Sequence, residues 1–162
     1  MATSEVKPFL NKRDADIFRF LGAPTAMRAT GATTGGAFAL MEHWSALPGY
    51  GSPLHTHTRE DESFYIVEGE VAFICDGKWM KAGAGDFVFG PKNIPHGFQV
   101  VGKEAARIVI LCNPAGFEDF VFEMKEPFDT PPGPPDVPRL IEAAAKRGII
   151  IHGPLPEIPA DL

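Results

Sequence analysis

The stretch GYGSPLHTHTREDESFYIVEG, residues 49–69, contains two histidines and a glutamate at a spacing that suits a metal ion. His55 and His57 are separated by one residue, and side chains on a strand alternate between its two faces, so both point the same way. Glu62 follows a charged, turn-like interval and begins the next apolar run, which returns a carboxylate beside the two imidazoles. The stretch therefore predicts two adjoining strands that hold three ligands of one metal site.

Short β-type runs separated by turn residues surround this stretch. Glycine and proline, 17 and 16 of the 162 residues, punctuate these runs and do not form a low-complexity tract. Short strands without helices between them favour an antiparallel sandwich or barrel over a parallel sheet. We expect strands over residues 37–44, 54–58, 62–67, 71–76, 86–90, 96–101 and 106–112.

The pattern changes after the last of these strands. Apolar residues at i, i+3, i+4 and i+7 predict a helix over residues 115–125 that lies against the sheet. A proline-rich connector, residues 131–135, leads to a second predicted helix over 137–147. The apolar triplet 149–151 is then expected to form a short strand, covered either by its own barrel or by a second subunit.

Length, charge and cysteine usage limit the possible functions. At 162 residues and 17.5 kDa the chain is most simply one domain, 1–162, with a barrel core at about 37–112 and a helical C-terminal extension at about 113–162. A net charge of -6 without a basic cluster argues against nucleic-acid binding. No apolar run approaches the roughly 20 residues needed to span a membrane.

The two cysteines and the N-terminal residues indicate the cellular compartment in which we expect the protein. Only Cys75 and Cys112 are present, and the first residues show no targeting signal, so we expect a cytoplasmic protein with reduced thiols. Its expected partners are a small-molecule substrate and, in a homodimer, a second copy of the chain. The apolar tail or the N-terminal segment is the expected dimer seam.

A second segment completes the candidate metal site. Residues 85–96, GDFVFGPKNIPH, end a glycine-framed strand and hairpin at His96, the natural fourth ligand. Here the chain resembles the cupin superfamily, whose motifs are Gly-x5-His-x-His-x3–4-Glu-x6-Gly and Gly-x5-Pro-x-Gly-x2-His-x3-Asn. The first motif is met at every position, while the second departs at Asn93, where the family has glycine, and at Val100, where it has asparagine. Asparagine tolerates positive φ, and neither departure removes a ligand.

The resemblance implies an all-β fold, an antiparallel jelly-roll β-barrel with short C-terminal helices. It also implies that His55, His57, Glu62 and His96 converge on a metal inside the barrel mouth. The alternative is a purely structural role at the barrel rim, which three histidines and a glutamate at this spacing disfavour. Imidazole and carboxylate suit one divalent transition metal, Fe, Mn, Ni, Co, Cu or Zn, and the sequence does not choose among them.

Glu62 is also the candidate catalytic residue. Three neutral imidazoles and one carboxylate around a divalent ion leave a local charge of about +1 and one or two open positions, which an anionic oxygen ligand complements. A substrate hydroxyl bound at an open position becomes more acidic, and Glu62 is then within reach of its proton.

The residues expected around the metal indicate an apolar substrate. Period two, counted from Glu62 and from His96, points several aromatic and aliphatic side chains inward. No arginine or lysine has a motif-based reason to point into the barrel, which argues against sugar phosphates and favours an aromatic or otherwise apolar enol. The predicted substrate-binding residues are Phe64, Ile66, Phe98, Met41 and Phe73.

Among cupins, the chain looks most similar to the small single-domain bacterial proteins related to quercetin dioxygenase. The likeness lies in PLHTH (53–57), ESFYIVEG (62–69) and NPAGFEDF (113–120). It implies a metal-dependent dioxygenase that opens an aromatic enol ring, with the flavonol 3-hydroxyl on the metal and its proton given to Glu62. Two alternatives stay open: an isomerase or lyase that uses the same ligands without redox chemistry, and a non-enzymatic small-molecule binding cupin.

Two other polar groups are expected at the surface. His43 could face the cavity from the strand before the first motif or lie at the barrel surface, and because it has no spacing partner we expect the surface. The charged run 59–61 is expected to be a solvated hairpin tip that borders the metal. The segment 1–28 carries no recognisable chemistry.

Overall fold

The chain folds into two antiparallel β-sheets and three short helices, and the computed structural model describes residues 6–131 and 133–162. The larger sheet contains β1 (Ile17–Phe20), β2 (Ala23–Ala29), β3 (Ala39–Ala46), β5 (Asp61–Glu68), β8 (Phe87–Gly90), β10 (Ala106–Asn113) and β11 (Lys125–Glu126). The smaller sheet contains β4 (Leu54–His57), β6 (Glu70–Cys75), β7 (Lys78–Gly83), β9 (His96–Val101) and β12 (Ile149–Gly153). The helices are α1 (Gly31–Thr34), α2 (Phe117–Met124) and α3 (Val137–Lys146).

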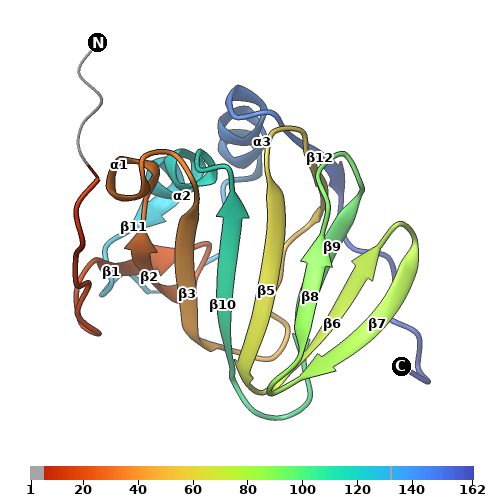
Figure 1. Cartoon of the computed structure of the whole chain (residues 1–162). Helices are drawn as coiled ribbons and strands as arrows, with labels where there is room; N and C mark the ends of the chain where they lie inside the picture. The colour runs from red at the N-terminus through yellow and green to blue at the C-terminus, as the bar shows by residue number, and fades with distance from the viewer. Residues whose placement is uncertain (1–5, 132) are drawn as a thin grey trace.

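The two sheets face each other as in a jelly roll (Figure 1). The strand order is β11-β1-β2-β3-β10-β5-β8 in the larger sheet and β12-β4-β9-β6-β7 in the smaller one. Within the described residues no strand pair joins one sheet to the other, so the sheets do not close into a barrel. The expected all-β jelly-roll fold is confirmed. Its two sheets form a sandwich and not a closed barrel.

All seven expected strands are present, with ends that differ slightly from the expected ones. Four strands were missed: β1, β2, β7 and the two-residue β11. β1 and β2 lie in the segment to which no role was assigned, and β7 has the sequence KWMKAG, which does not alternate polar and apolar residues. β7 is the edge strand of its sheet and is largely exposed, so no core selects an apolar face on it.

The C-terminal segment packs back onto the sheets. The first predicted helix is α2, whose apolar stripe is buried as expected: Phe117, Phe120, Val121 and Met124. The second is α3, and the apolar triplet after it forms β12, which pairs with β4. Ile149 is buried, while Ile150 is 49% exposed. The chain's own sheet therefore pairs with the triplet and buries Ile149, while Ile150 stays half exposed.

In the hairpin that leads to β9, the asparagine that replaces the glycine of the second motif has the positive φ expected there. Asn93 adopts a φ of 64°, in the left-handed region that asparagine tolerates better than most residues. Its N–H donates to the carbonyl of His57 at 2.7 Å. This hydrogen bond ties the hairpin to β4 and thus brings the two histidine-bearing segments together.

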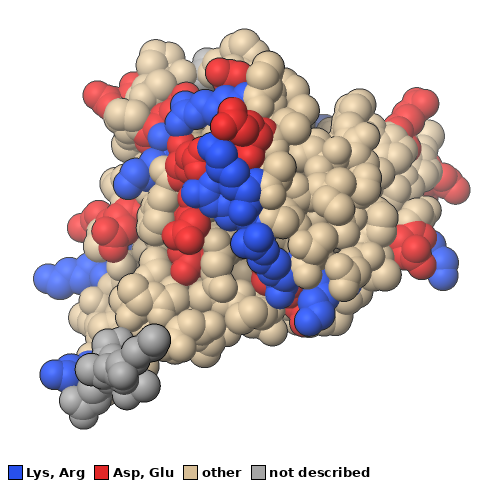
Figure 2. All heavy atoms as spheres, turned by 90° about the horizontal axis from the view of Figure 1, so that it is seen from above, with Lys and Arg blue, Asp and Glu red and all other residues tan. Residues whose placement is uncertain are grey.

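The face at the helical end of the molecule has mixed charge (Figure 2). Acidic and basic side chains lie side by side there. The ion pairs of the helical segment include Lys146 with Glu142 at 2.9 Å and Arg147 with Glu123. A phosphate-binding surface needs uncompensated positive charge, which this face does not offer.

No helix in residues 6–131 and 133–162 is both long enough and apolar enough to cross a membrane.

Candidate metal centre

Four buried side chains from three strands meet between the two sheets. His55 and His57 lie on β4 and His96 lies on the neighbouring β9, where it is paired directly with His55. Glu62 reaches across from β5 in the facing sheet. One ligand atom from each residue lies within 4.8 Å of the others, so the four side chains could hold one metal ion.

Hydrogen bonds to the outer ring nitrogens orient all three imidazoles. In each histidine Nδ1 donates away from the centre, and Nε2 is left facing it. The acceptors are the Pro53 carbonyl for His55 (2.8 Å), the Ile94 carbonyl for His96 (2.9 Å) and the Glu60 carboxylate for His57 (2.8 Å). A backbone carbonyl cannot donate, so the structure of the chain itself selects Nε2 as the inward atom of His55 and His96.

The inward atoms are too close to one another to coexist as acceptors. Glu62 Oε2 lies 2.9 Å from Nε2 of His96 and 3.4 Å from Nε2 of His57. The Nε2 atoms of His55 and His57 are 3.1 Å apart. Lone pairs at such distances repel unless a positive charge lies between them, and protons or a metal ion can supply it. The donor set of three imidazole nitrogens and a carboxylate fits a divalent transition metal.

Burial and mutual charge shift the pKa values within this cluster. Burial lowers the pKa of His55. Burial acts in the same direction on His57, but the carboxylates of Glu62 and Glu60 outweigh it and raise the pKa of His57 to about 9. Burial would raise the pKa of Glu62, but the surrounding histidines hold it well below its usual range. Without a metal, a proton on His57 therefore balances Glu62, and metal binding must release this proton.

Glu60 is part of this cluster and not of a solvated hairpin tip. It is only 3% exposed, and its carboxylate accepts from His57 Nδ1. The expectation for residues 59–61 was wrong at this position because a run of charges does not reveal that one of its members lies beside a buried histidine. Glu60 fixes the ring of His57 and increases its basicity toward a metal.

Glu60→Gln is expected to weaken metal binding by about 10–100-fold, the usual cost of losing a partner behind a metal-binding histidine. The amide keeps the shape and an acceptor oxygen but loses the charge. Competition with a chromophoric chelator measures the affinity. Asp61→Asn, a change at the neighbouring partly exposed carboxylate, is the control and is expected to bind metal as the parent protein does. Equal affinity of Glu60→Gln and parent would contradict this role of Glu60.

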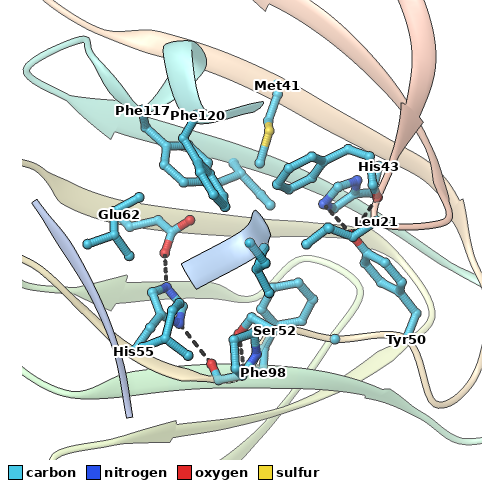
Figure 3. Close-up of a pocket in the computed structure, with 17 residues that line it drawn as sticks. Leu21, Met41, His43, Tyr50, Ser52, His55, Glu62, Phe98, Phe117 and Phe120 are labelled. Carbon is cyan, nitrogen blue, oxygen red and sulfur yellow. Dashed lines mark hydrogen bonds and ion pairs between the residues drawn. The ribbon is translucent and has the colours of Figure 1, made fainter. Parts of the chain in front are cut away.

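An apolar cavity adjoins the cluster (Figure 3). His55 and Glu62 form part of its wall, and no lysine or arginine lines it. Of the predicted substrate-binding residues, Met41 and Phe98 line the cavity.

Three predicted substrate-binding residues, Phe64, Ile66 and Phe73, pack in the core and do not line this cavity. They point inward as expected, and each is at most 3% exposed. The ring centroids of Phe64 and Phe73 are 4.9 Å apart. Period two identifies the face of a strand but not the depth at which a residue lies between the sheets, so it did not separate these three residues from the cavity wall.

Several residues of the cavity wall were missed. Phe117 and Phe120 belong to α2, and their apolar stripe was predicted to face the sheet without any link to the metal. His43 and Tyr50 also line the cavity. His43 is 1% exposed, so its expected place on the outside of the barrel is wrong. Alternation from Met41 on β3 was the available signal, since it puts His43 on the same face.

The fold and this cluster define a jelly-roll protein with a candidate three-histidine, one-glutamate metal centre. Residues 42–112 match the family model of the cupin domain. These residues therefore form a cupin domain. Over 75 residues the chain is 28% identical to quercetin 2,3-dioxygenase of Bacillus subtilis, a match that covers 46% of this chain and 22% of that protein.

Two further relatives extend the comparison. The polyketide synthase CurC of Streptomyces cyaneus is 30% identical over 110 residues, which are 68% of this chain and 66% of that protein. The crystal structure of an RmlC-like cupin from Shewanella frigidimarina superimposes with a TM-score of 0.58 at 22% identity, covering 69% of this chain and 95% of that one. This chain thus spans less than two thirds of the length of the two named enzymes, and the crystal structure supports the fold alone.

Proposed function

We propose that this protein is a metal-dependent dioxygenase that opens the ring of an aromatic enol of the flavonol type. The observation that carries the proposal is a three-histidine, one-glutamate cluster that opens directly onto an apolar cavity free of lysine and arginine. The likeness to quercetin 2,3-dioxygenase gives the proposed reaction class.

His55, His57, Glu62 and His96 would hold the metal, which when bound supplies a Lewis acid for the substrate enol and a redox centre for oxygen chemistry. Glu62 accepts the proton of the enol hydroxyl. Its carboxylate is ionised because the surrounding histidines hold its pKa well below the usual range. The aromatic side chains of the wall, Phe98, Phe117 and Phe120, keep the enol ring in a water-poor space and hold it flat against their surfaces.

An oxygen-uptake screen tests this function. We expect the iron-, manganese-, nickel-, cobalt- or copper-loaded protein to consume oxygen with a flavonol and to bleach its long-wavelength absorbance, and we expect no bleaching under strict anaerobiosis. Metal-stripped protein is the control. Loss of the flavonol absorbance without oxygen, at the same rate as in air, would rule out the dioxygenase.

A non-redox conversion of a polyketide-type aromatic is the second candidate. The specific observation in its favour is the 30% identity to a polyketide synthase over 68% of this chain, a longer match than that to the dioxygenase. The same four side chains and the same apolar cavity suit both reactions. Oxygen uptake separates them, because this second reaction consumes none.

A further inference from the structure

The cavity has a second polar group, formed by His43 on β3 and Tyr50 in the loop that follows β3. In Figure 3 these two side chains lie on one side of the cavity, while Glu62 and His55 lie on the other. His43 Nε2 is 3.4 Å from the Tyr50 hydroxyl. Apart from this pair and the candidate metal cluster, the wall is largely apolar.

The protonation state of His43 follows from its partners. Thr25 donates its single hydroxyl hydrogen to the carbonyl of Ala23 at 3.0 Å. The hydroxyl oxygen of Thr25 also lies 2.9 Å from His43 Nδ1, and with its hydrogen on the Ala23 carbonyl it accepts from Nδ1, the tautomer that leaves Nε2 without a hydrogen. Burial lowers the pKa of His43 to about 4, so the ring is neutral near pH 7. Its Nε2 is thus a bare acceptor beside the cavity.

The Tyr50 hydroxyl does not fully satisfy this acceptor. It has one hydrogen and two acceptors, His43 Nε2 at 3.4 Å and the Phe20 carbonyl at 3.2 Å, and both distances are long for O–H···N and O–H···O hydrogen bonds. Burial raises the pKa of Tyr50, so its hydroxyl stays protonated. The pair thus has an acceptor and a donor with hydrogen-bonding capacity left for a ligand.

The loop that carries Tyr50 is held in place by β9. Gly49 N–H donates to the Val100 carbonyl at 2.9 Å, and Val100 N–H donates to the Tyr50 carbonyl at 2.7 Å. Gly51 lies so close to β9 that a Cβ there would be 2.1 Å from the Phe98 carbonyl oxygen. This pairing fixes the backbone from which the Tyr50 side chain reaches the cavity wall.

We propose that His43 and Tyr50 bind a hydroxyl group at the end of the substrate that faces away from the metal centre. This inference rests on the proposed function and narrows its substrate class to aromatic enols that carry a second, distal hydroxyl. A hydroxyl can donate to His43 Nε2 and accept from Tyr50 at the same time. A carboxylate could only accept, and no lysine or arginine in the wall would balance its charge.

His43 acts here by positioning and not as a general base. A group with a pKa of about 4 takes up little proton near pH 7 but still accepts a hydrogen bond. The pair therefore selects substrates and fixes their direction in the cavity, with the enol at the metal and the distal hydroxyl at His43 and Tyr50.

The test compares two kinds of flavonol on zinc-loaded protein without oxygen, where binding occurs without turnover. One flavonol has no hydroxyl on its pendant phenyl ring. Its analogues have a single hydroxyl on that ring, at the meta or the para position. We expect the parent protein to bind at least one analogue about tenfold more tightly than the unsubstituted flavonol, the effect of one good buried hydrogen bond. The shift of the flavonol absorption band measures each affinity.

Tyr50→Phe and His43→Phe keep an aromatic ring and remove one polar group each. Both are expected to reduce the preference to less than about threefold while binding the unsubstituted flavonol as the parent does, which also shows that the site is folded. Tyr65→Phe removes the hydroxyl of an exposed tyrosine outside the cavity wall and should keep the preference.

The inference fails if the parent protein binds neither compound, or if it binds the hydroxylated analogues no more tightly than the unsubstituted flavonol. It also fails if both phenylalanine variants retain the preference for a hydroxylated analogue. Failure of the proposed function gives a different result: the zinc-loaded protein keeps the preference for the hydroxylated analogue, but the protein consumes no oxygen with any redox-active metal.

Discussion

His55→Ala and His96→Ala are expected to abolish stoichiometric metal binding. Each removes one of four converging ligand atoms, and because losing a partner behind a ligand already costs about 10–100-fold, losing a ligand should cost more than about 100-fold in affinity. Oxygen uptake with a flavonol should fall with the bound metal. Elemental analysis of protein purified without a histidine tag measures the occupancy.

His152→Ala is the matched control for this experiment. His152 is exposed, and its Nε2 lies 2.8 Å from the Thr56 hydroxyl, outside the candidate metal centre. This variant should keep the metal content of the parent. Full occupancy in both His55→Ala and His96→Ala would refute the assignment of the centre.

The meeting of the four side chains could be predicted because the spacing rules of strands are local. His55 and His57 share a face by alternation, and the turn after them returns Glu62 on the next strand. The place of His96 beside His55 depends on a long-range strand pair, which alternation cannot supply. Only the resemblance to the cupin motifs linked these two segments before the structure did.

The rest of the site was not predictable because it depends on depth and on packing between distant segments. Phe64 and Ile66 have the right alternation, yet they lie in the core, while Phe117 reaches the cavity from a helix. His43 was assigned to the surface because one partner, Thr25, lies in a strand that carried no motif, and the other, Tyr50, occupies an unspecified position of the first motif. Tertiary structure, and not a local pattern, defines these contacts.

The two glutamates of the centre illustrate how similar residues acquire different roles. Glu60 and Glu62 are two positions apart, and both are buried. Glu60 contacts the outer nitrogen of His57, whereas Glu62 faces the inner nitrogens and the cavity. Only Glu62 can therefore contact both a bound metal and a substrate.

Glu62→Gln should consequently lower turnover by about 10²–10⁴-fold at equal metal occupancy, the usual contribution of a positioned general base. The amide has nearly the same shape, but it cannot accept the enol proton and no longer carries the charge that balances the centre. Rates are compared per bound metal under saturating flavonol in air, so that weaker metal binding does not mimic a slower reaction. Glu60→Gln, loaded to the same occupancy, is the control and should turn over within about tenfold of the parent, since it acts through His57 alone. Unchanged turnover per metal in Glu62→Gln would exclude this carboxylate as the base.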